Sequence, residues 1–415
     1  MATRYLLDWW VCLQFQDGNY CCSNKAVHSS TSDRISDLPS NVIENILMCL
    51  PIRDAVRITI LSKTWRHRWA DVPQVVFDDT FLRNSREVIE GSTTHELLMK
   101  TVYEVLLLHF GPIHKFVLSI SGLKSCPEID RLILFLSTKG IQDFTLDFSS
   151  EYPAYHKLPS YLFTCLQLRY LKLCSCIFKP PPSFNGFSKL ISIQFQGVHF
   201  DAEFLKDFIS NCPLLERLKL HSCVEISCLE INAPNLKLLH YISAYKCICF
   251  KNAPLLAELS IYESSFGEPD SDKRKLFNLI EVFSCLPAIE YLSVDYYFLK
   301  DLAVPDSSMR LQTTLNHLKF LKMLELSYAE VEEVSPALCL IRSSPNLQKL
   351  EIRMYCRHND GRNPFLQLSE WDGFLDFSLN QLQEVKLQGF HGTRPELEFV
   401  KLLLAKSSAL KSDAY

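Results

Sequence analysis

The feature that most constrains the fold of this chain is an apolar pattern that recurs along most of its length. Apolar residues (Φ) follow the spacing Φ-x-x-Φ-x-Φ, and successive copies begin 20 to 35 residues apart. The last two apolar positions are two residues apart, so they point to the same side of a short strand. One such strand is unstable alone, and we expect the copies to stack on one another. Eleven copies begin at Ile113, Ile141, Leu168, Leu190, Leu215, Leu236, Leu256, Ile289, Leu321, Leu347 and Leu382.

Prolines support this division of the chain. Pro213, Pro234, Pro254, Pro287 and Pro345 each stand two residues before the first apolar position of a copy. Proline cannot continue a helix, so it ends the returning segment of one copy before the strand of the next begins. The copies have the length of leucine-rich repeats. The pattern therefore predicts an α/β fold: an irregular leucine-rich-repeat solenoid, with a curved parallel sheet and helices or turns on its convex side.

The 16 cysteines are scattered, and no Cys-x-x-Cys pair occurs. Zinc modules normally need such pairs, so no metal and no other cofactor is expected. Cys176 and Cys223 each follow the last leucine of a copy by three residues, where leucine-rich repeats turn an Asn or Cys inward. We expect reduced, buried thiols that fill the core. Reduced thiols in turn indicate a cytoplasmic or nuclear protein.

Composition and motifs exclude several classes of function. The net charge of -4 argues against a general nucleic-acid binder. No run of about 20 apolar residues is present, so no membrane-spanning helix is expected. The chain contains no GxGxxG, GxxxxGK[ST], GxSxG or HExxH motif. We therefore predict no catalytic residue and no enzymatic activity.

The N-terminal part has a different, helical pattern. Ile43, Ile46, Leu47 and Leu50 have the i, i+3, i+4, i+7 spacing of one helix face. The surrounding segment resembles an F-box of the kind found in large plant families. The resemblance covers about 40 residues in order and spacing. Its matching residues are Leu38-Pro39, Ile43, Ile46-Leu47, Leu50-Pro51, Asp54-Ala55 and Leu61-Ser62-Lys63-x-Trp65-Arg66-x-x-Trp69.

The F-box resemblance implies a partner. F-boxes dock through three helices onto a Skp-type adaptor, which is held by a cullin scaffold. A module of this size exposes more apolar surface than it can bury alone, and a partner helix would cover it. The alternative is a purely structural role, as a helical cap on the end of the repeats. The residues that the resemblance assigns to the adaptor are Leu38, Pro39, Ile43, Ile46, Leu47, Leu50, Pro51, Leu61 and Trp65.

The C-terminal part also resembles a plant family. A strand-like segment, 382–392, and a helix-like segment, 396–404, are similar to the FBD segment that follows leucine-rich repeats in plant F-box proteins. The family segment normally continues with another strand, so we expect the segment here to be truncated. The predicted domains are 1–32, a disordered extension; 33–75, the F-box; 76–112, a helical connector; 113–372, the repeats; and 373–415, the FBD-like segment.

The repeats offer a second binding surface. In each copy the residue between the last two apolar positions points away from the core, onto the concave sheet. We predict that this sheet binds a protein target, and that repeats nine and ten of this row are acidic. A polar face that serves only solubility is the alternative. The candidate target-binding residues are Lys172, Lys219, His221, His240, Tyr262, Asp295, Glu325, Glu351 and Arg353.

Together the two resemblances imply the substrate-recognition subunit of a Skp–cullin–F-box ubiquitin ligase. The F-box would bind the adaptor, and the repeats would bind an unknown protein target. The expected partners are therefore this adaptor, the cullin and the target, with no nucleic acid and no membrane. The alternative is a leucine-rich-repeat interaction or sensor protein that recruits no ligase.

Overall fold

A computed structural model describes residues 38–50, 52–58, 65, 68–83, 94–148, 155–200, 204–224, 228–244, 247–263, 277–303, 314–326, 331–354 and 377–410. The chain divides into two compact units, Met1–Leu168 and Arg169–Tyr415. Each unit combines parallel strands with helices, as the predicted α/β class requires. The predicted Pro51 and Leu61 contacts and the N-terminal extension lie outside the described residues.

The first unit begins with the helical module. Ile43 and Leu47 of the first described helix are buried, and Trp65 and Trp69 fill the space beneath it. The elements of this unit are α2 (Ser40–Met48), α3 (Ile52–Ile58), η1 (Arg68–Asp71), β1 (Gln74–Asp78), α4 (Asp79–Arg83), α5 (Thr94–Leu107), β2 (Lys115–Ser119), α6 (Pro127–Ser137), β3 (Asp143–Asp147), β4 (His156–Lys157) and η2 (Ser160–Thr164).

The strands β1, β2 and β3 are parallel neighbours in this order. Val75 of β1 pairs with Phe116 of β2, which pairs with Phe144 of β3. The strand β1 lies where the sequence predicted only a helical F-box and connector, so that description missed a strand. Val72, Val75 and Phe77 are an additional copy of the repeat pattern. Because this copy has no leucine, it is hard to recognise from sequence.

The second unit carries most of the repeats. Its main strands are parallel neighbours in the order β5, β7, β8, β10, β12, β14, β16, β17, β18. Its elements are β5 (Tyr170–Cys174), β6 (Cys176–Ile177), β7 (Ser192–Gln196), α7 (Phe204–Ser210), β8 (Arg217–His221), β9 (Cys228–Asn232), β10 (Leu238–Ile242), β11 (Cys247–Asn252), β12 (Glu258–Tyr262), β13 (Phe277–Asn278), α8 (Leu279–Ser284), β14 (Tyr291–Asp295), α9 (Tyr296–Asp301), β15 (Leu302–Ala303), β16 (Phe320–Leu326), α10 (Val331–Arg342), β17 (Lys349–Met354), β18 (Glu384–Gln388) and α11 (Arg394–Lys406).

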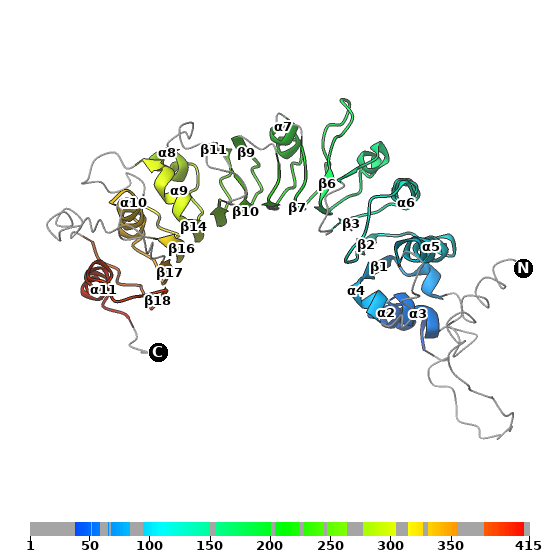
Figure 1. The fold of residues 1–415 in the computed structure, drawn as a ribbon, viewed down its shortest axis with the longest axis horizontal. Coiled ribbons are helices and arrows are strands. Elements are labelled where there is room, and N and C mark those ends of the chain that lie inside the picture. The colour runs from blue at the N-terminus through cyan, green and yellow to red at the C-terminus, as the bar shows by residue number, and fades with distance from the viewer. Residues whose placement is uncertain are drawn as a thin grey trace, which may run out of the picture. The chain divides into compact units, whose positions relative to one another are not determined.

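The main strands of this unit have one buried and one open side. The second and third apolar positions of each copy form continuous ladders, and Leu218, Leu220 and Leu239 are at most 1% exposed. The helices α7, α9 and α10 and the β9–β11 pair lie on the buried side of the sheet (Figure 1). We call the other side of the strands β5 to β18 the open face.

One predicted register is wrong. The apolar spacing predicts Leu321, Leu324 and Leu326 at the three apolar positions of repeat nine. Instead, Leu321 and Met323 pair with the buried Leu350 and Ile352 of β17. The first apolar position is therefore Leu318, which is fully buried. The pattern fits the leucines of this repeat in two phases, and no proline marks the correct one.

A cluster of phenylalanines fills the core beside α7. Phe178 is fully buried, and its ring centroid lies 5.3 Å from those of Phe195 and Phe208 and 5.9 Å from that of Phe200. Large aromatic side chains bury more apolar surface than leucine, and tilted ring pairs add a favourable contact. The cluster therefore joins the repeats of β5, β7 and α7 through side-chain packing.

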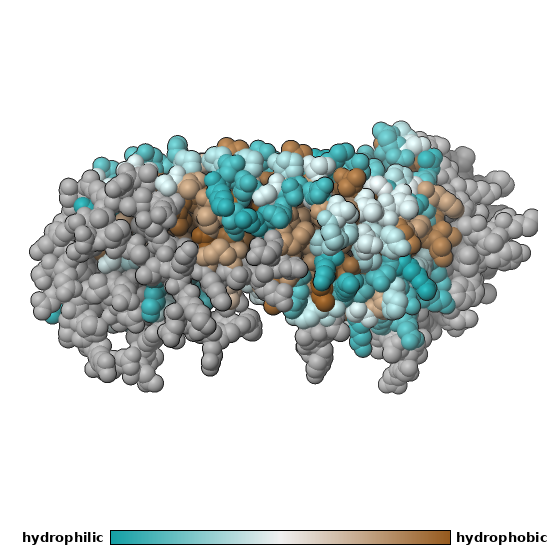
Figure 2. Space-filling model, turned by 90° about the horizontal axis from the view of Figure 1, so that it is seen from above, coloured by the Kyte–Doolittle hydropathy of each residue, from teal (hydrophilic) through white to brown (hydrophobic). Residues whose placement is uncertain are grey.

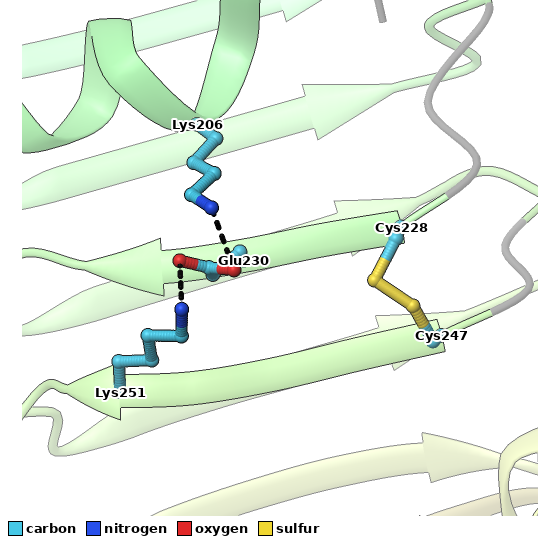
Figure 3. Close-up of a disulfide and its surroundings, with 5 residues drawn as sticks. All are labelled: Lys206, Cys228, Glu230, Cys247 and Lys251. Carbon is cyan, nitrogen blue, oxygen red and sulfur yellow. Dashed lines mark ion pairs between the residues drawn. A yellow bond between two sulfur atoms is a disulfide. The ribbon is translucent and has the colours of Figure 1, made fainter. Parts of the chain in front are cut away.

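The expectation of buried, reduced cysteines is met only in part, because Cys49 and Cys249 are exposed free thiols. Cys176 and Cys223 are buried, as predicted, and burial raises the pKa of Cys223 to about 12, so this thiol stays protonated. Cys228 of β9 and Cys247 of β11 instead form a disulfide (Figure 3). The expectation of reduced cysteines is wrong for this pair. These two strands are register partners one repeat apart, which brings the sulfur atoms together.

The β9–β11 pair also carries an ion cluster. Glu230 of β9 forms ion pairs with Lys206 of α7 at 3.2 Å and with Lys251 of β11 at 2.7 Å (Figure 3).

In Figure 2, hydrophobic and hydrophilic side chains are interspersed over the part of the surface that is drawn in colour. Among the helices that the structure describes, none is long and apolar enough to cross a membrane.

Candidate functional site

The helix α2 separates the predicted adaptor residues into two groups. Ile43 and Leu47 are each 1% exposed, and Trp65 is 3% exposed, so these three residues hold the module together. Ile46 is 36% exposed and Pro39 is exposed, while Leu38 and Leu50 are half-buried. We call Leu38, Pro39, Ile46 and Leu50 the α2 surface. Adaptor contact by the inward residues would require the module to open, whereas the α2 surface is available without any change.

Local contacts fix the position of α2. Arg68 of η1 donates a hydrogen bond to Ser40 Oγ at 3.1 Å, and the Gln74 side chain donates to the carbonyl oxygen of Met48. These bonds attach the two ends of α2 to η1 and β1. The helix is therefore held by the first strand of its own unit, and its exposed apolar residues keep a defined orientation relative to that strand.

The open face of the second unit is lined by a continuous row of side chains. Register pairing places one residue from the middle of each strand beside its neighbour. In strand order, this central row is Lys172, Gln194, Lys219, His240, Ser260, Ser293, Lys322, Glu351 and Lys386. The structure thus brings Lys172, Lys219, His240 and Glu351 of the predicted target-binding residues into one row.

Aromatic side chains occupy the middle of the open face. Tyr262 donates a hydrogen bond from its hydroxyl to Ser293 Oγ at 2.6 Å, and its ring centroid lies 5.7 Å from that of His240. Tyr291 and Phe320 form an edge-to-face pair with centroids 4.9 Å apart. The predicted Tyr262 therefore takes part in a fixed network. The half-buried Tyr291 and Phe320, which were not among the predicted residues, lie two residues before Ser293 and Lys322 on the same side of their strands.

Three predicted target-binding residues need correction. Glu325 lies at a register irregularity with a φ of 62°, so it leaves the central row to Lys322. Glu351 is 8% exposed and forms an ion pair with Lys322 at 3.0 Å. Repeats nine and ten are therefore not acidic as predicted, since the central row places a lysine beside the one glutamate. His221 and Arg353 are exposed at the next outward positions of β8 and β17.

The predicted target-binding role of Asp295 is also wrong, because its side chain is only 5% exposed. Its carboxylate accepts hydrogen bonds from the backbone N–H of Phe298, at 3.0 Å, and of Glu263. It thus caps the start of α9 and anchors the end of β12. Burial raises the pKa of Asp295 from 3.8 to about 7, although both hydrogen bonds act in the opposite direction.

The raised pKa of Asp295 gives a testable pH dependence. The unfolded chain loses this proton near pH 3.8, whereas the folded chain keeps it to about pH 7. Its stabilising contribution is full below the unfolded pKa and is lost as the pH rises through the folded pKa. We expect about 2 to 3 kcal/mol of loss between about pH 5 and pH 8. The contribution of the Asp295 carboxyl group is obtained as the difference in the free energy of unfolding in urea between the parent protein and Asp295→Asn. A difference that is constant with pH would contradict the prediction.

The glutamates in the C-terminal part of the open face are paired with lysines. Glu351 has Lys322 at 3.0 Å and Lys386 at 4.0 Å, and Glu384 lies 2.8 Å from Lys349. The pKa of Glu351 is lowered, chiefly by the hydrogen bond from Lys322. These lysines and glutamates form an ion-pair network across β16, β17 and β18.

A serine, a histidine and an aspartate are joined in the first unit. His156 Nδ1 lies 2.8 Å from Ser125 Oγ, and its Nε2 lies 3.0 Å from Asp130 Oδ1. In a hydrolytic triad the orienting carboxylate is buried, but the Asp130 side chain is 46% exposed. The imidazole is buried and stacks on Phe148 with centroids 5.1 Å apart. We interpret these hydrogen bonds as a structural link between α6 and β4.

Comparison with known proteins identifies the family of both parts of the chain. The F-box domain family model matches residues 35–75. The leucine-rich repeats of the FBD-associated F-box protein At5g56370 match residues 129–352. The F-box/FBD/LRR-repeat protein At1g13570 of Arabidopsis thaliana is 37% identical, with 92% of this chain and 90% of that protein covered. The F-box/FBD/LRR-repeat protein At3g52680 of the same plant is 27% identical, with 92% and 85% covered. The chain therefore belongs to the plant family of F-box/FBD/LRR-repeat proteins.

Proposed function

We propose that the protein is the non-catalytic substrate-recognition subunit of a Skp–cullin–F-box ubiquitin ligase and acts in the cytoplasm or nucleus. The observation that carries this proposal is the α2 surface, within the F-box match, where Ile46 stays exposed although the neighbouring Ile43 and Leu47 are buried. A partner that covers Ile46 together with the adjoining Pro39 would remove their apolar surface from water. In this proposal a helix of the Skp adaptor does so, and the cullin is held through the adaptor.

The open face supplies the second half of the proposed function. Its strands present aromatic, basic and polar side chains on a fixed sheet, and such side chains are frequent in protein-binding sites. A target held there is near a conjugating enzyme that is bound elsewhere in the complex. The protein then accelerates ubiquitin transfer by raising the effective concentration of the target and needs no catalytic residue of its own.

Copurification with a Skp adaptor tests the proposal. The full chain is coexpressed with the adaptor and a cullin N-terminal domain, and the complex is analysed by size-exclusion chromatography. We expect the three proteins to elute together in equal amounts. Elution of the chain alone would reject the ligase function. It would favour the alternative, a leucine-rich-repeat interaction or sensor protein that recruits no ligase.

A further inference from the structure

The part of the open face formed by β5, β7, β8 and β10 has an unbalanced charge. We call this part the basic half. Among its open-face side chains, Lys172, Arg217 and Lys219 carry permanent positive charge, His221 and His240 can gain it, and no carboxylate is present on these four strands. The whole chain has a net charge of -4. The basic half is therefore a local feature and does not follow from the overall composition.

Within the described part of the chain, the permanent cations of the basic half have no carboxylate partner. Among the described residues, no carboxylate forms an ion pair with Lys172, Arg217 or Lys219, although Arg217 lies over the ring of Tyr170 at 5.7 Å. The other half of the same face differs, since both lysines of its central row, Lys322 and Lys386, lie within 4.0 Å of the carboxylate of Glu351. Lys172 and Lys219 are separated by Gln194 of β7, so their positive charges repel each other without a carboxylate between them. An opposite charge supplied from outside would relieve this repulsion.

The pKa of His240 is affected by the same positive charges. Burial lowers the pKa of His240, and the positive charges of Lys219 and His221 lower it further. The neighbouring Tyr262 ring lies in a T-shaped arrangement with the imidazole. The imidazole therefore lies in a positive environment that the protein itself does not balance.

From this charge distribution we propose that the basic half binds an extended acidic segment of the protein target. This inference rests on the proposed function, because it names the chemistry of the target that the repeats would recognise. Neighbouring strands are about 4.8 Å apart, so Lys172 and Lys219, two strands apart, are about 10 Å from each other. Carboxylates three residues apart in an extended segment are separated by about this distance, and those two residues apart, at about 7 Å, are within reach of the long lysine side chains. The half-buried Leu238 and Ile242 beside them accept its apolar side chains.

Peptide binding tests this proposal on the full chain. The probes are fluorescein-labelled peptides of twelve residues with the repeats Glu-Gly, Gln-Gly and Lys-Gly, and a single-stranded DNA of twelve nucleotides. We expect the Glu-Gly peptide to bind at least about tenfold more tightly than the Gln-Gly peptide at low salt, by fluorescence anisotropy. The proposal fails if the two peptides bind equally. It also fails if the DNA binds more tightly than the Glu-Gly peptide.

Two matched double variants locate the site. Lys172→Gln/Lys219→Gln removes two unpaired cations of the basic half, and Lys349→Gln/Lys386→Gln removes two cations that already face glutamates. Both change the net charge equally. We expect about a tenfold loss of Glu-Gly binding in the first variant and less than about twofold in the second. Equal losses would show a general charge effect and overturn the proposal.

The two hypotheses can fail separately. Peptide binding is measured without the adaptor, and adaptor copurification is measured on the same double variants. Loss of peptide selectivity with normal adaptor copurification would reject only the acidic-target inference. Selective peptide binding without adaptor copurification would reject the ligase function and keep the basic half as a binding site for an acidic segment.

Discussion

Ile46→Glu is expected to abolish copurification of the protein with a Skp adaptor and to leave its fold intact. Ile46 is 36% exposed on α2, so a carboxylate at this position stays in water in the free protein. In the proposed complex the same carboxylate is buried against an apolar partner without a counter-charge, which is costly. Truncation of a central interface residue typically costs at least about 2 kcal/mol, or about 30-fold in affinity. A buried charge should cost more.

Two further variants separate binding from folding. Asn45→Glu adds the same charge at the neighbouring exposed position of α2 and should leave the adaptor affinity within about threefold. Ile43→Glu places the charge at a position that is only 1% exposed, so it should unfold the module. Affinity is measured by surface plasmon resonance, and folding by circular dichroism. Full adaptor affinity in Ile46→Glu would exclude the α2 surface as the docking site.

Phe178→Ala should have the largest effect on stability. The Phe178 ring is fully buried among Phe195, Phe200 and Phe208, and its removal leaves a cavity that these rigid rings cannot fill. Substitutions of this type cost about 3 to 5 kcal/mol. The free energy of unfolding, measured in urea by circular dichroism, should fall by this amount.

A matched control for the phenylalanine cluster lies nearby in the same unit. Leu214 is 49% exposed, so Leu214→Ala removes apolar atoms that are largely in water and should cost less than about 0.5 kcal/mol. Repeats contact only their neighbours, so the loss at Phe178 should be largest in β5, β7 and β8. Hydrogen exchange can show this directly. Equal protection of all the repeats in Phe178→Ala would contradict a local role for the cluster.

Sequence could predict the repeats wherever a second signal marked the phase. Pro213 stands two residues before Leu215, and Leu215, Leu218 and Leu220 are indeed fully buried. In repeat nine Asn316 takes the position of this proline, and the leucines fit the pattern in two phases. Pairing with β14 and β17 selects the phase of Leu318. A local pattern cannot make this choice, because the choice depends on residues one repeat away.

The candidate surfaces were predictable to a smaller extent. The spacing of α2 correctly grouped Ile43, Ile46 and Leu47 on one side of the helix, but it could not tell which of them the module itself buries. The same limit applies to Asp295. Its position in β14 predicts an outward side chain, yet the start of α9 and the end of β12 supply two backbone donors that hold it inside.

The sequence by itself determined that the chain forms stacked strands, because the apolar spacing follows from the geometry of a single strand. It also determined the F-box, whose residues lie close together along the chain. Only the tertiary structure decided that β1 adds a strand, that Cys228 meets Cys247, and that Glu351 is neutralised whereas Lys172 and Lys219 are not. The physical reason is distance: burial and charge balance arise between side chains of different repeats, and sequence spacing alone does not fix which of these meet.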